Sequence, residues 1–163
     1  MTLNRRILLA AGAPLAFAAC GFELRRAPEF VFKTIQVGST ENSTLGNELK
    51  RSIASGGGVT VVPLDRAEVV LEVLADQREK VVVGLNASGQ VREFQLRIRF
   101  KFRLRTPAGK ELIPETELLQ QRDISFNESA VLSKEAEESL LYRDMQTDIV
   151  QQLMRRLAAV KAI

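Results

Sequence analysis

An alternation of apolar and basic residues between Val91 and Arg105 limits the folds open to this chain. Within the stretch LRIRFKFRLR, which starts at Leu96, every second residue is apolar and every other one is a cation. Successive side chains of a β-strand point to opposite faces, so this period of two predicts a strand with one buried and one charged face. The fold must therefore contain a sheet that covers a core on one side only.

Further elements on both sides of this strand predict an α+β domain. Four more strands are expected, at 30–37, 59–62, 68–83 and 110–126. A helix is the alternative for the first half of 68–83, and Pro114 should make the last strand irregular. Helices are expected over 44–54 and from Ser133, as the N-cap, to about Val160, because apolar residues recur at every fourth position in both segments. The apolar stripe of the second helix is Leu141, Met145, Ile149, Leu153 and Leu157. The order predicts a single antiparallel-rich sheet of about four strands with two helices packed on one face.

The N-terminal residues have the pattern of an export signal. Arg5 and Arg6 precede an apolar run over 7–17, and Ala18-Ala19 precede Cys20, the only cysteine. The run is too short to span a membrane, and the small-residue exit indicates a signal peptide. A lone cysteine directly after Ala-Ala resembles a bacterial lipoprotein signal. The resemblance implies that residues 1–19 are removed and that Cys20 carries a diacylglycerol and an N-linked acyl chain such as palmitate. The alternative is an ordinary signal peptide followed by a free cysteine, because Phe17 stands where lipoprotein signals usually carry Leu.

Lipidation of Cys20 would fix the mature protein to a membrane. A single acyl chain binds a bilayer only marginally, at about 0.8 kcal/mol per buried CH₂, whereas two or three chains on one cysteine hold it stably. Gly21, rather than Asp, after the cysteine favours the outer membrane. The pair Arg5-Arg6 leaves both Sec and twin-arginine export open. We expect residues 20–29 to form a tether and residues 30–163 a single domain.

The remaining composition argues against nucleic-acid binding and against catalysis. Loss of Arg5 and Arg6 would lower the formal net charge of +3 by two, to +1, whereas nucleic-acid binders usually carry a domain-wide basic excess. The sequence has no histidine, and it lacks GxSxG, P-loop, dinucleotide-loop and metal-ligand patterns. Glu137 and Tyr142 are better explained as parts of a helix. The sequence thus predicts a non-enzymatic protein with no cofactor other than its covalent lipid.

The cations of the alternating strand have both a structural and a functional interpretation. The return strand supplies four carboxylates, which are Glu111, Glu115, Glu117 and Asp123. A hairpin that pairs odd positions with odd would set Arg99 opposite Glu115 or Glu117, and Arg103 opposite Glu111. Such cross-strand pairs contribute roughly 0.2–1 kcal/mol each. The small cationic excess that is left would suit an anionic lipid head group or the polar lumen of a β-barrel.

Several segments, in this order along the chain, resemble the LptE family of lipopolysaccharide-assembly lipoproteins. They are CGFELR from Cys20, GQVREFQL from Gly89, RDISFN from Arg122 and VLSKEAEE from Val131. Asp144-Met145 and Arg155-Arg156-Leu157 also fall where the family's last helix has them. The resemblance extends from Cys20 to about Leu157. It implies a four-stranded sheet with two helices.

The resemblance also implies a function, which residue types and periodicity alone do not indicate. LptE proteins plug the outer-membrane β-barrel LptD from the periplasmic side, help it assemble and bind lipopolysaccharide. The lipopolysaccharide contact of the family involves basic residues at one end of the sheet, and Lys134 matches one of them. Another such position is occupied here by Ala87-Ser88, so that Arg92 is the candidate in its place. Further candidates on the sheet face are Arg97, Arg99, Lys101 and Arg103. Two alternatives stay open: a stand-alone periplasmic-facing lipoprotein that binds another anionic ligand through its basic sheet face, and a lipoprotein of some other envelope complex.

Overall fold

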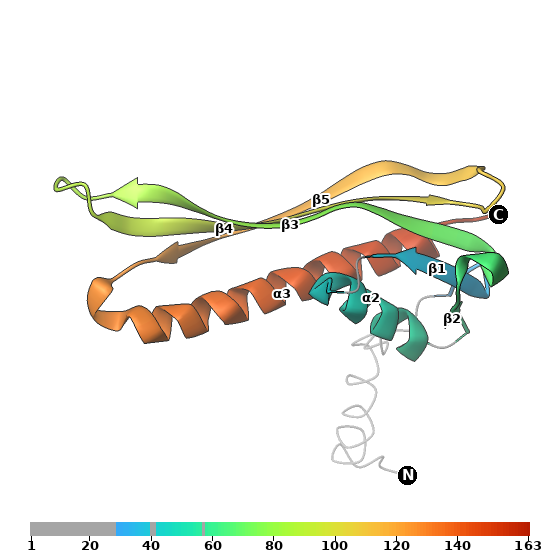
Figure 1. The fold of residues 1–163 in the computed structure, drawn as a ribbon, viewed down its shortest axis with the longest axis horizontal. Coiled ribbons are helices and arrows are strands. Elements are labelled where there is room, and N and C mark those ends of the chain that lie inside the picture. The colour runs from blue at the N-terminus through green and yellow to red at the C-terminus, as the bar shows by residue number, and fades with distance from the viewer. Residues whose placement is uncertain (1–28, 40–41, 57) are drawn as a thin grey trace, which may run out of the picture.

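A computed structural model describes residues 29–39, 42–56 and 58–163, so that the predicted signal peptide, Cys20 and nearly all of the tether lie outside the described residues. It contains one sheet, in the order β2-β1-β3-β4-β5 (Figure 1). The strands are β1 (Thr34–Gly38), β2 (Thr60–Val61), β3 (Val69–Leu85), β4 (Val91–Arg105) and β5 (Glu111–Ser125). The first three pair in parallel, while β3, β4 and β5 form an antiparallel meander. The α+β class is confirmed, with five strands and a parallel part that the sequence pattern did not predict.

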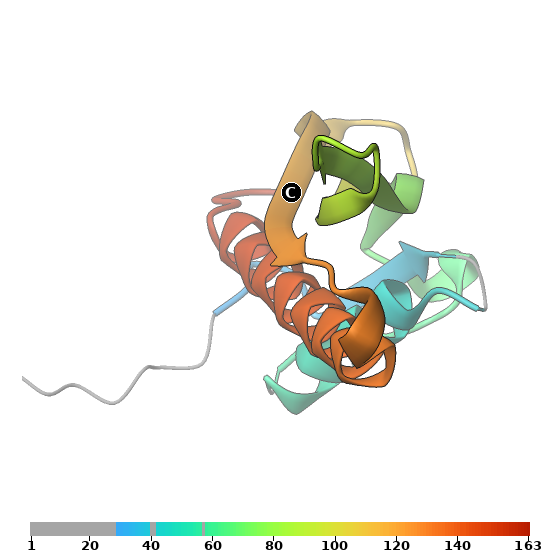
Figure 2. The same ribbon diagram turned by 90° about the vertical axis from the view of Figure 1, so that its left-hand side faces the viewer.

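Both helices lie on the same face of this sheet. They are α2 (Thr44–Ser55) and α3 (Val131–Ala158), and Figure 2 shows them side by side beneath the strands. Helix α2 connects the parallel strands β1 and β2, which cannot be joined by a tight turn. Its N-terminus is capped by Ser43, whose hydroxyl accepts a hydrogen bond from the Gly46 N–H at 2.7 Å. The helix predicted over 44–54 is therefore confirmed.

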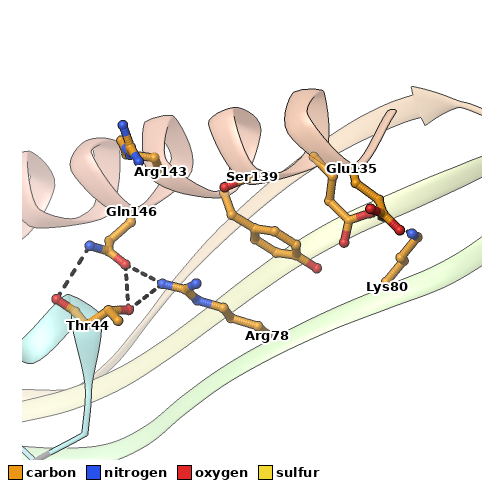
Figure 3. Close-up of a pocket in the computed structure, with 9 residues that line it drawn as sticks. Thr44, Arg78, Lys80, Glu135, Ser139, Arg143 and Gln146 are labelled. Atoms are coloured by element: carbon orange, nitrogen blue, oxygen red, sulfur yellow. Dashed lines mark hydrogen bonds and ion pairs between the residues drawn. The ribbon is translucent and has the colours of Figure 1, made fainter. Parts of the chain in front are cut away.

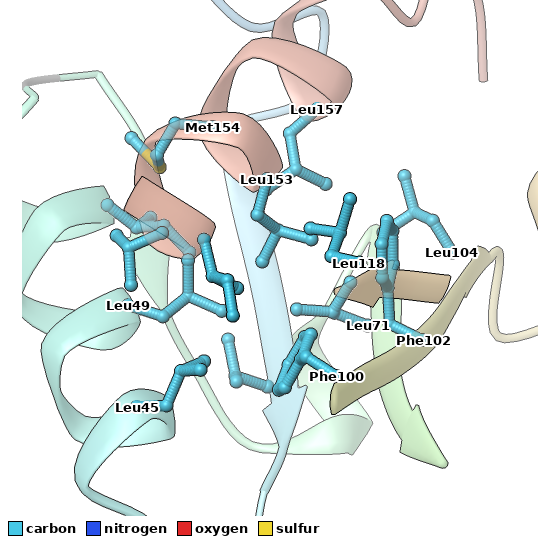
Figure 4. Packing of buried hydrophobic residues seen from close by; sticks show 14 of the residues in the cluster. Leu45, Leu49, Leu71, Phe100, Phe102, Leu104, Leu118, Leu153, Met154 and Leu157 are labelled. Atoms are coloured by element: carbon cyan, nitrogen blue, oxygen red, sulfur yellow. The ribbon is translucent and has the colours of Figure 1, made fainter. Parts of the chain in front are cut away.

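The core lies between the sheet and the two helices (Figure 4). All apolar residues of the β4 alternation are fully buried, and they are Leu96, Ile98, Phe100, Phe102 and Leu104. Helix α3 buries four residues of its predicted stripe, Met145, Ile149, Leu153 and Leu157, and the fifth, Leu141, packs against the core partly buried. Helix α2 contributes Leu45, Leu49 and Ile53. The cations of β4 consequently lie on the face of the sheet opposite the helices, as the alternation predicts.

The strand predicted over 30–37 begins later than expected, at Thr34. Phe32 is buried in the core, and its ring packs 5.4 Å from that of Phe30, but neither residue belongs to a strand. The Glu68 carboxylate accepts a hydrogen bond from the Lys33 backbone N–H at 2.6 Å. Before β1, the Glu68 side chain thus accepts the backbone hydrogen bond that a neighbouring strand would otherwise accept. Phe30 and Phe32, which were predicted to lie in the strand, instead pack against the core from the segment that precedes it.

The N-cap predicted at Ser133 is wrong. A short 3-10 turn, Glu128–Ala130, comes directly before α3, and its first residues are held by the Asn127 side chain, which accepts from the Ser129 N–H at 3.0 Å. The helix therefore starts at Val131, and the Ser133 hydroxyl donates to the Ala130 carbonyl at 2.8 Å instead of capping the helix. The stronger asparagine turn upstream decides where the helix begins.

Candidate functional site

The charged face of β4 is largely neutralised by carboxylates of the two neighbouring strands, β5 and β3. Lys101 lies opposite Glu117, and its Nζ is 3.2 Å from Glu115 and 3.8 Å from Glu117. The residue directly opposite Arg99 is Leu119, but the Arg99 guanidinium reaches diagonally to Glu117 at 3.6 Å. The predicted odd-with-odd register is therefore confirmed for this part of the hairpin.

Farther along the hairpin, the predicted contact between Arg103 and Glu111 is wrong. The register shifts around Pro114, so that Glu111 lies opposite Arg105. Arg103 and Arg105 both bind Glu72 of β3, with 2.6 Å between Arg105 Nη2 and the carboxylate. These hydrogen bonds, from Arg103 first and Arg105 second, hold the pKa of the Glu72 carboxyl below its usual value. Nothing in the local sequence signals this pairing, because it depends on the register between β3 and β4.

We predict that Glu72→Gln lowers the free energy of unfolding at pH about 7 by roughly 0.2–1 kcal/mol, the usual range for exposed ion pairs. Because the pKa of Glu72 is lower in the folded state than its ordinary value of 4.5, the ion pairs stabilise the fold fully above pH 4.5. This stability is lost as the pH falls through the folded-state pKa. Urea unfolding of both proteins at pH about 7 and about 3 measures this, and the difference should shrink in acid. Glu111→Gln is the matched control. A difference that is independent of pH would contradict the ionic origin.

Arg97 differs from the other cations of this face. It lies between Glu79 of β3 and Gln121 of β5, and its Nε donates to Gln95 Oε1 at 2.7 Å. Among the described residues, no carboxylate lies within ion-pair distance of Arg97. Of the predicted candidates on the sheet face, Arg99, Lys101 and Arg103 are therefore ion-paired and Arg97 is not.

The other predicted candidates, Lys134 and Arg92, lie at the end of the molecule where β3 turns into β4 and α3 begins (left in Figure 1). Lys134 Nζ is 2.8 Å from Glu137 and donates to the Ser125 hydroxyl at 2.9 Å. Arg92 is exposed, and the only hydrogen bond that its side chain makes within the described residues goes to Gln90 at 3.4 Å. The structure thus brings Lys134 and Arg92 to the same end, separate from the paired sheet face.

The sequence pattern missed a third cation at this end, Lys80. Its Nζ lies 4.4 Å from the centre of the Phe94 ring and 2.6 Å from Glu138. A register shift between Val73 and Ala75 reverses which face of the sheet the later residues of β3 occupy, so Lys80 points toward α3. Residues 76–80 are all polar, so the sequence has no apolar alternation there in which a change of face could be seen. The position of Lys80 beside Lys134 could therefore not be predicted from the sequence.

Exposed apolar side chains accompany these three cations. They belong to the end of β3 and the first turns of α3, and they are Val82, Val83, Leu85, Val131, Leu132 and Leu140. Leu132 is the most exposed of them, at 83%. We call this region, comprising these residues with Lys80, Arg92 and Lys134, the amphipathic end. Apolar surface next to cations is suited to a ligand that is itself amphipathic and anionic.

The two residues considered for catalysis have structural partners. Glu137 pairs with Lys134, and the Tyr142 hydroxyl donates to the Glu79 carbonyl at 2.8 Å. Within the described ranges, no cluster of side chains could hold a metal ion. The helices of these ranges also include none that is long and apolar enough to cross a membrane.

Tyr142 should titrate above the ordinary tyrosine value. Burial, followed by the nearby charge of Glu138, raises the pKa of its hydroxyl above 10.0. Because the chain has one tyrosine and no tryptophan, phenolate absorbance reports this group alone. The contribution to stability is present below pH 10.0 and is lost as the pH rises through the folded-state value. An alkaline titration of the folded protein, with the urea-unfolded chain as control, should give a higher midpoint when folded. Equal midpoints would contradict the burial.

Comparison with known proteins decides the family. The family model LptE, described as lipopolysaccharide-assembly, matches residues 32–157, which is most of the chain. The chain belongs to the LptE family. It is 27% identical over 165 aligned residues to the LPS-assembly lipoprotein LptE of Yersinia enterocolitica, covering 98% of this chain and 78% of that protein. The prediction made from the short LptE-like segments is thereby confirmed.

Solved structures of LptE-like lipoproteins share the fold. The solution structure of lipoprotein B from Nitrosomonas europaea is 35% identical and matches with a TM-score of 0.74, covering 85% of this chain and 91% of that one. The crystal structure of the rare lipoprotein B from Shewanella oneidensis is 24% identical, with a TM-score of 0.64, covering 78% of this chain and 95% of that one. The family to which this chain belongs is thus one of lipopolysaccharide-assembly lipoproteins.

Proposed function

We propose that this protein plugs the LptD β-barrel, helps it assemble, and binds lipopolysaccharide for insertion into the outer leaflet. The observation that carries the proposal is the separation of two surfaces on an LptE fold. One is the sheet face whose cations are mostly paired with carboxylates, and the other is the amphipathic end. The first suits a polar protein wall, and the second suits an anionic lipid.

The paired sheet face supports the plug. The lumen of a large outer-membrane barrel is polar, and a charge enclosed there without a partner would be strongly unfavourable. Arg99, Lys101 and Arg105 each have a carboxylate within 4 Å, at 3.6, 3.2 and 2.6 Å. Covering this face therefore leaves few charges to be neutralised by the barrel. Most of the cationic alternation is then a surface matched to the lumen, and Arg97 is a spare cation for a lipid phosphate.

The amphipathic end supports the lipid contact. Lipopolysaccharide carries phosphates beside acyl chains, and cations beside exposed apolar side chains can bind both parts at once. Arg92 has no carboxylate partner in the described part of the chain, so its charge is available to a ligand. Lys134 is held by one carboxylate and one hydroxyl, which position its ammonium group at the start of α3.

The lipid anchor completes the proposal. Removal of residues 1–19 and lipidation of Cys20 would fix the protein to the outer membrane, with residues 20–29 as the tether and the domain facing the periplasm and the barrel lumen. In cells depleted of LptD, where no barrel can hold the domain, replacing Cys20 by serine should release the protein from washed membranes. Retention of the Cys20→Ser protein in these membranes after alkaline extraction would contradict anchoring by lipid.

The plug is tested by pulling the tagged protein from outer membranes in mild detergent and identifying its partners by mass. We expect a stoichiometric large β-barrel. The double variant Lys101→Glu with Arg103→Glu should lose the barrel while still unfolding in one cooperative transition, at a somewhat lower temperature because its ion pairs are lost. Arg155→Glu, on the exposed side of α3, should retain the barrel. Recovery of the wild type as a monomer, from cells that contain LptD, would contradict the plug. It would favour the stand-alone lipoprotein with another anionic ligand.

The lipid contact is tested with purified protein and lipopolysaccharide. Lys134→Gln and Arg92→Gln should each weaken binding roughly 10- to 100-fold, the loss that follows from removing one charge-assisted hydrogen bond. Arg155→Gln is the control, because it removes the same charge far from the amphipathic end. Unchanged affinity in both Lys134→Gln and Arg92→Gln would place the lipid elsewhere.

A further inference from the structure

A groove of about 620 Å³ runs between β3 and α3, on the helix side of the sheet (Figure 3). Its lining is polar, with Arg78 and Lys80 from β3, Thr44 from α2, and side chains of α3 from Glu135 to Gln146. That stretch of α3 rises about 16 Å at 1.5 Å per residue. The groove is therefore long enough for a ligand with two chemically different ends.

Arg78 forms one end of the groove and is held in place without a carboxylate. Its Nη2 donates to the Thr44 hydroxyl at 2.5 Å and to Gln146 Oε1, and its guanidinium lies 5.5 Å from the centre of the Tyr142 ring. Gln146 is itself only 7% exposed, and it is fixed by bonds to the Thr44 carbonyl and to Glu48. In the described residues no carboxylate lies within ion-pair distance of Arg78, and its Nε and Nη1 have no acceptor. An immobilised guanidinium with free donors is a receptor for an anion.

The start of α2 also lies at this end, with Thr44 as the first residue of the helix. The N-terminus of a helix carries a partial positive charge. The Asp76 carboxylate, which accepts a hydrogen bond from the hydroxyl of the N-cap Ser43 at 2.6 Å, already offsets part of that charge. The fixed arginine is therefore the feature that favours an anion here.

The opposite end of the groove has the opposite character. Glu135 and Glu138 lie there, and only Glu138 is paired, with Lys80 at 2.6 Å. These carboxylates disfavour a ligand that is anionic throughout, but they accept hydrogen bonds from hydroxyl groups. The Ser139 hydroxyl lies between the two ends and adds a donor and an acceptor.

We propose that this groove binds a phosphorylated sugar, with the phosphate on Arg78 and the sugar hydroxyls on Glu135 and Ser139. The groove adjoins the Lys134 contact, with which it shares Lys80, and lies along the flank of α3. The inference deepens the lipopolysaccharide binding proposed above, and rests on it for the natural ligand: the phosphorylated saccharide of the lipid lies in the groove while its acyl chains meet the amphipathic end.

The site is tested with glucose 6-phosphate, using the fluorescence of Tyr142, which lines the groove and is the one fluorescent tyrosine in a chain without tryptophan. We expect a saturable change in emission. Inorganic phosphate alone and glucose alone should each bind at least tenfold more weakly, because each fills one end of the groove only. Arg78→Gln should weaken glucose 6-phosphate binding roughly 10- to 100-fold, and Arg78→Lys should weaken it less.

Two further variants separate binding from folding. Ser139→Phe leaves Arg78 and its partners intact but fills the groove from an exposed position of α3, and it should also abolish the response. Arg155→Gln removes the same charge from the last turn of α3, outside the groove, and should bind as the wild type does. Melting temperatures confirm that each variant is folded. No saturable response from the wild type, equal affinity of Arg78→Gln, or equal affinity for inorganic phosphate would each overturn the proposal.

A last experiment measures binding of lipopolysaccharide in detergent micelles. It separates a failure of the groove proposal from a failure of the lipid binding proposed above. Weaker binding by both Arg78→Gln and Lys134→Gln supports the groove as part of the lipid site. Weaker binding by Lys134→Gln alone overturns the groove and leaves the proposed function standing. No binding by the wild type overturns the proposed lipid binding, and the glucose 6-phosphate titration then decides the groove by itself.

Discussion

Replacing Phe100 by alanine should lower the free energy of unfolding by about 3–5 kcal/mol, as expected for a fully buried aromatic ring. Phe100 is 0% exposed, and its ring lies 6.1 Å from that of Phe102 in the middle of the core. Leu118 is opposite it on β5. Removal of the ring leaves a cavity that β4 cannot close without moving both neighbouring strands. Against a typical domain stability of 5–15 kcal/mol, this loss is a large fraction.

Urea unfolding followed by circular dichroism measures the effect of Phe100→Ala. The matched control is Leu119→Ala, which lies next to Leu118 but on the outer face and is 44% exposed. Its free energy of unfolding should stay within about 0.5 kcal/mol of the wild type. Equal losses in the two variants would contradict the assignment of opposite faces to neighbouring residues of β5.

Replacing Gly46 by alanine should also destabilise the protein, by roughly 1–3 kcal/mol, although alanine is usually the better helix residue by about 1 kcal/mol. Gly46 is buried in the first turn of α2. A Cβ there would lie 2.5 Å from Ser39 Cβ and 2.9 Å from the Ser43 hydroxyl, which caps the helix. Overpacking would therefore displace the cap as well as the segment before it.

The sign of the Gly46→Ala effect is the informative result. Ala54→Gly, at an exposed position near the other end of α2, should cost about 1 kcal/mol by propensity alone. Both substitutions are thus expected to lower the melting temperature, although they exchange the same two residue types in opposite directions. A higher melting temperature for Gly46→Ala would show that Ser39 does not pack against the helix.

The parts of the fold that follow from local periodicity could be predicted from the sequence. The alternation in β4 identified its buried face, and the fourth-position spacing in α2 and α3 identified theirs, because burial on one face imposes a period. The start of α3 could not be predicted in this way, since a turn held by Asn127 comes before Ser133. The bulge in β3, which reverses the faces of Arg78 and Lys80, could not be predicted either, because the polar residues around it show no apolar alternation.

The candidate site residues were likewise predictable only in part. The family resemblance indicated Lys134, and periodicity indicated the cations of the sheet face. The groove had no such signal, because Arg78 lies 34 residues from Thr44 and 68 from Gln146. Gln146 follows Met145 of the apolar stripe and has the residue type of a solvated position, yet it is buried. Contacts between elements so distant in the chain are properties of the tertiary fold alone.

The topology of the sheet also bears on how the protein folds after export. Strands β3, β4 and β5 follow one another through short turns at 86–90 and 106–110, so their pairing closes only small loops. Strand β1, by contrast, must pair with β3 across a separation of about 34 residues, as between Ile35 and Val69. Local pairs form faster than distant ones. We therefore expect the meander of β3, β4 and β5 to be the folding nucleus, so that β1, although it comes first in the chain, joins the sheet last.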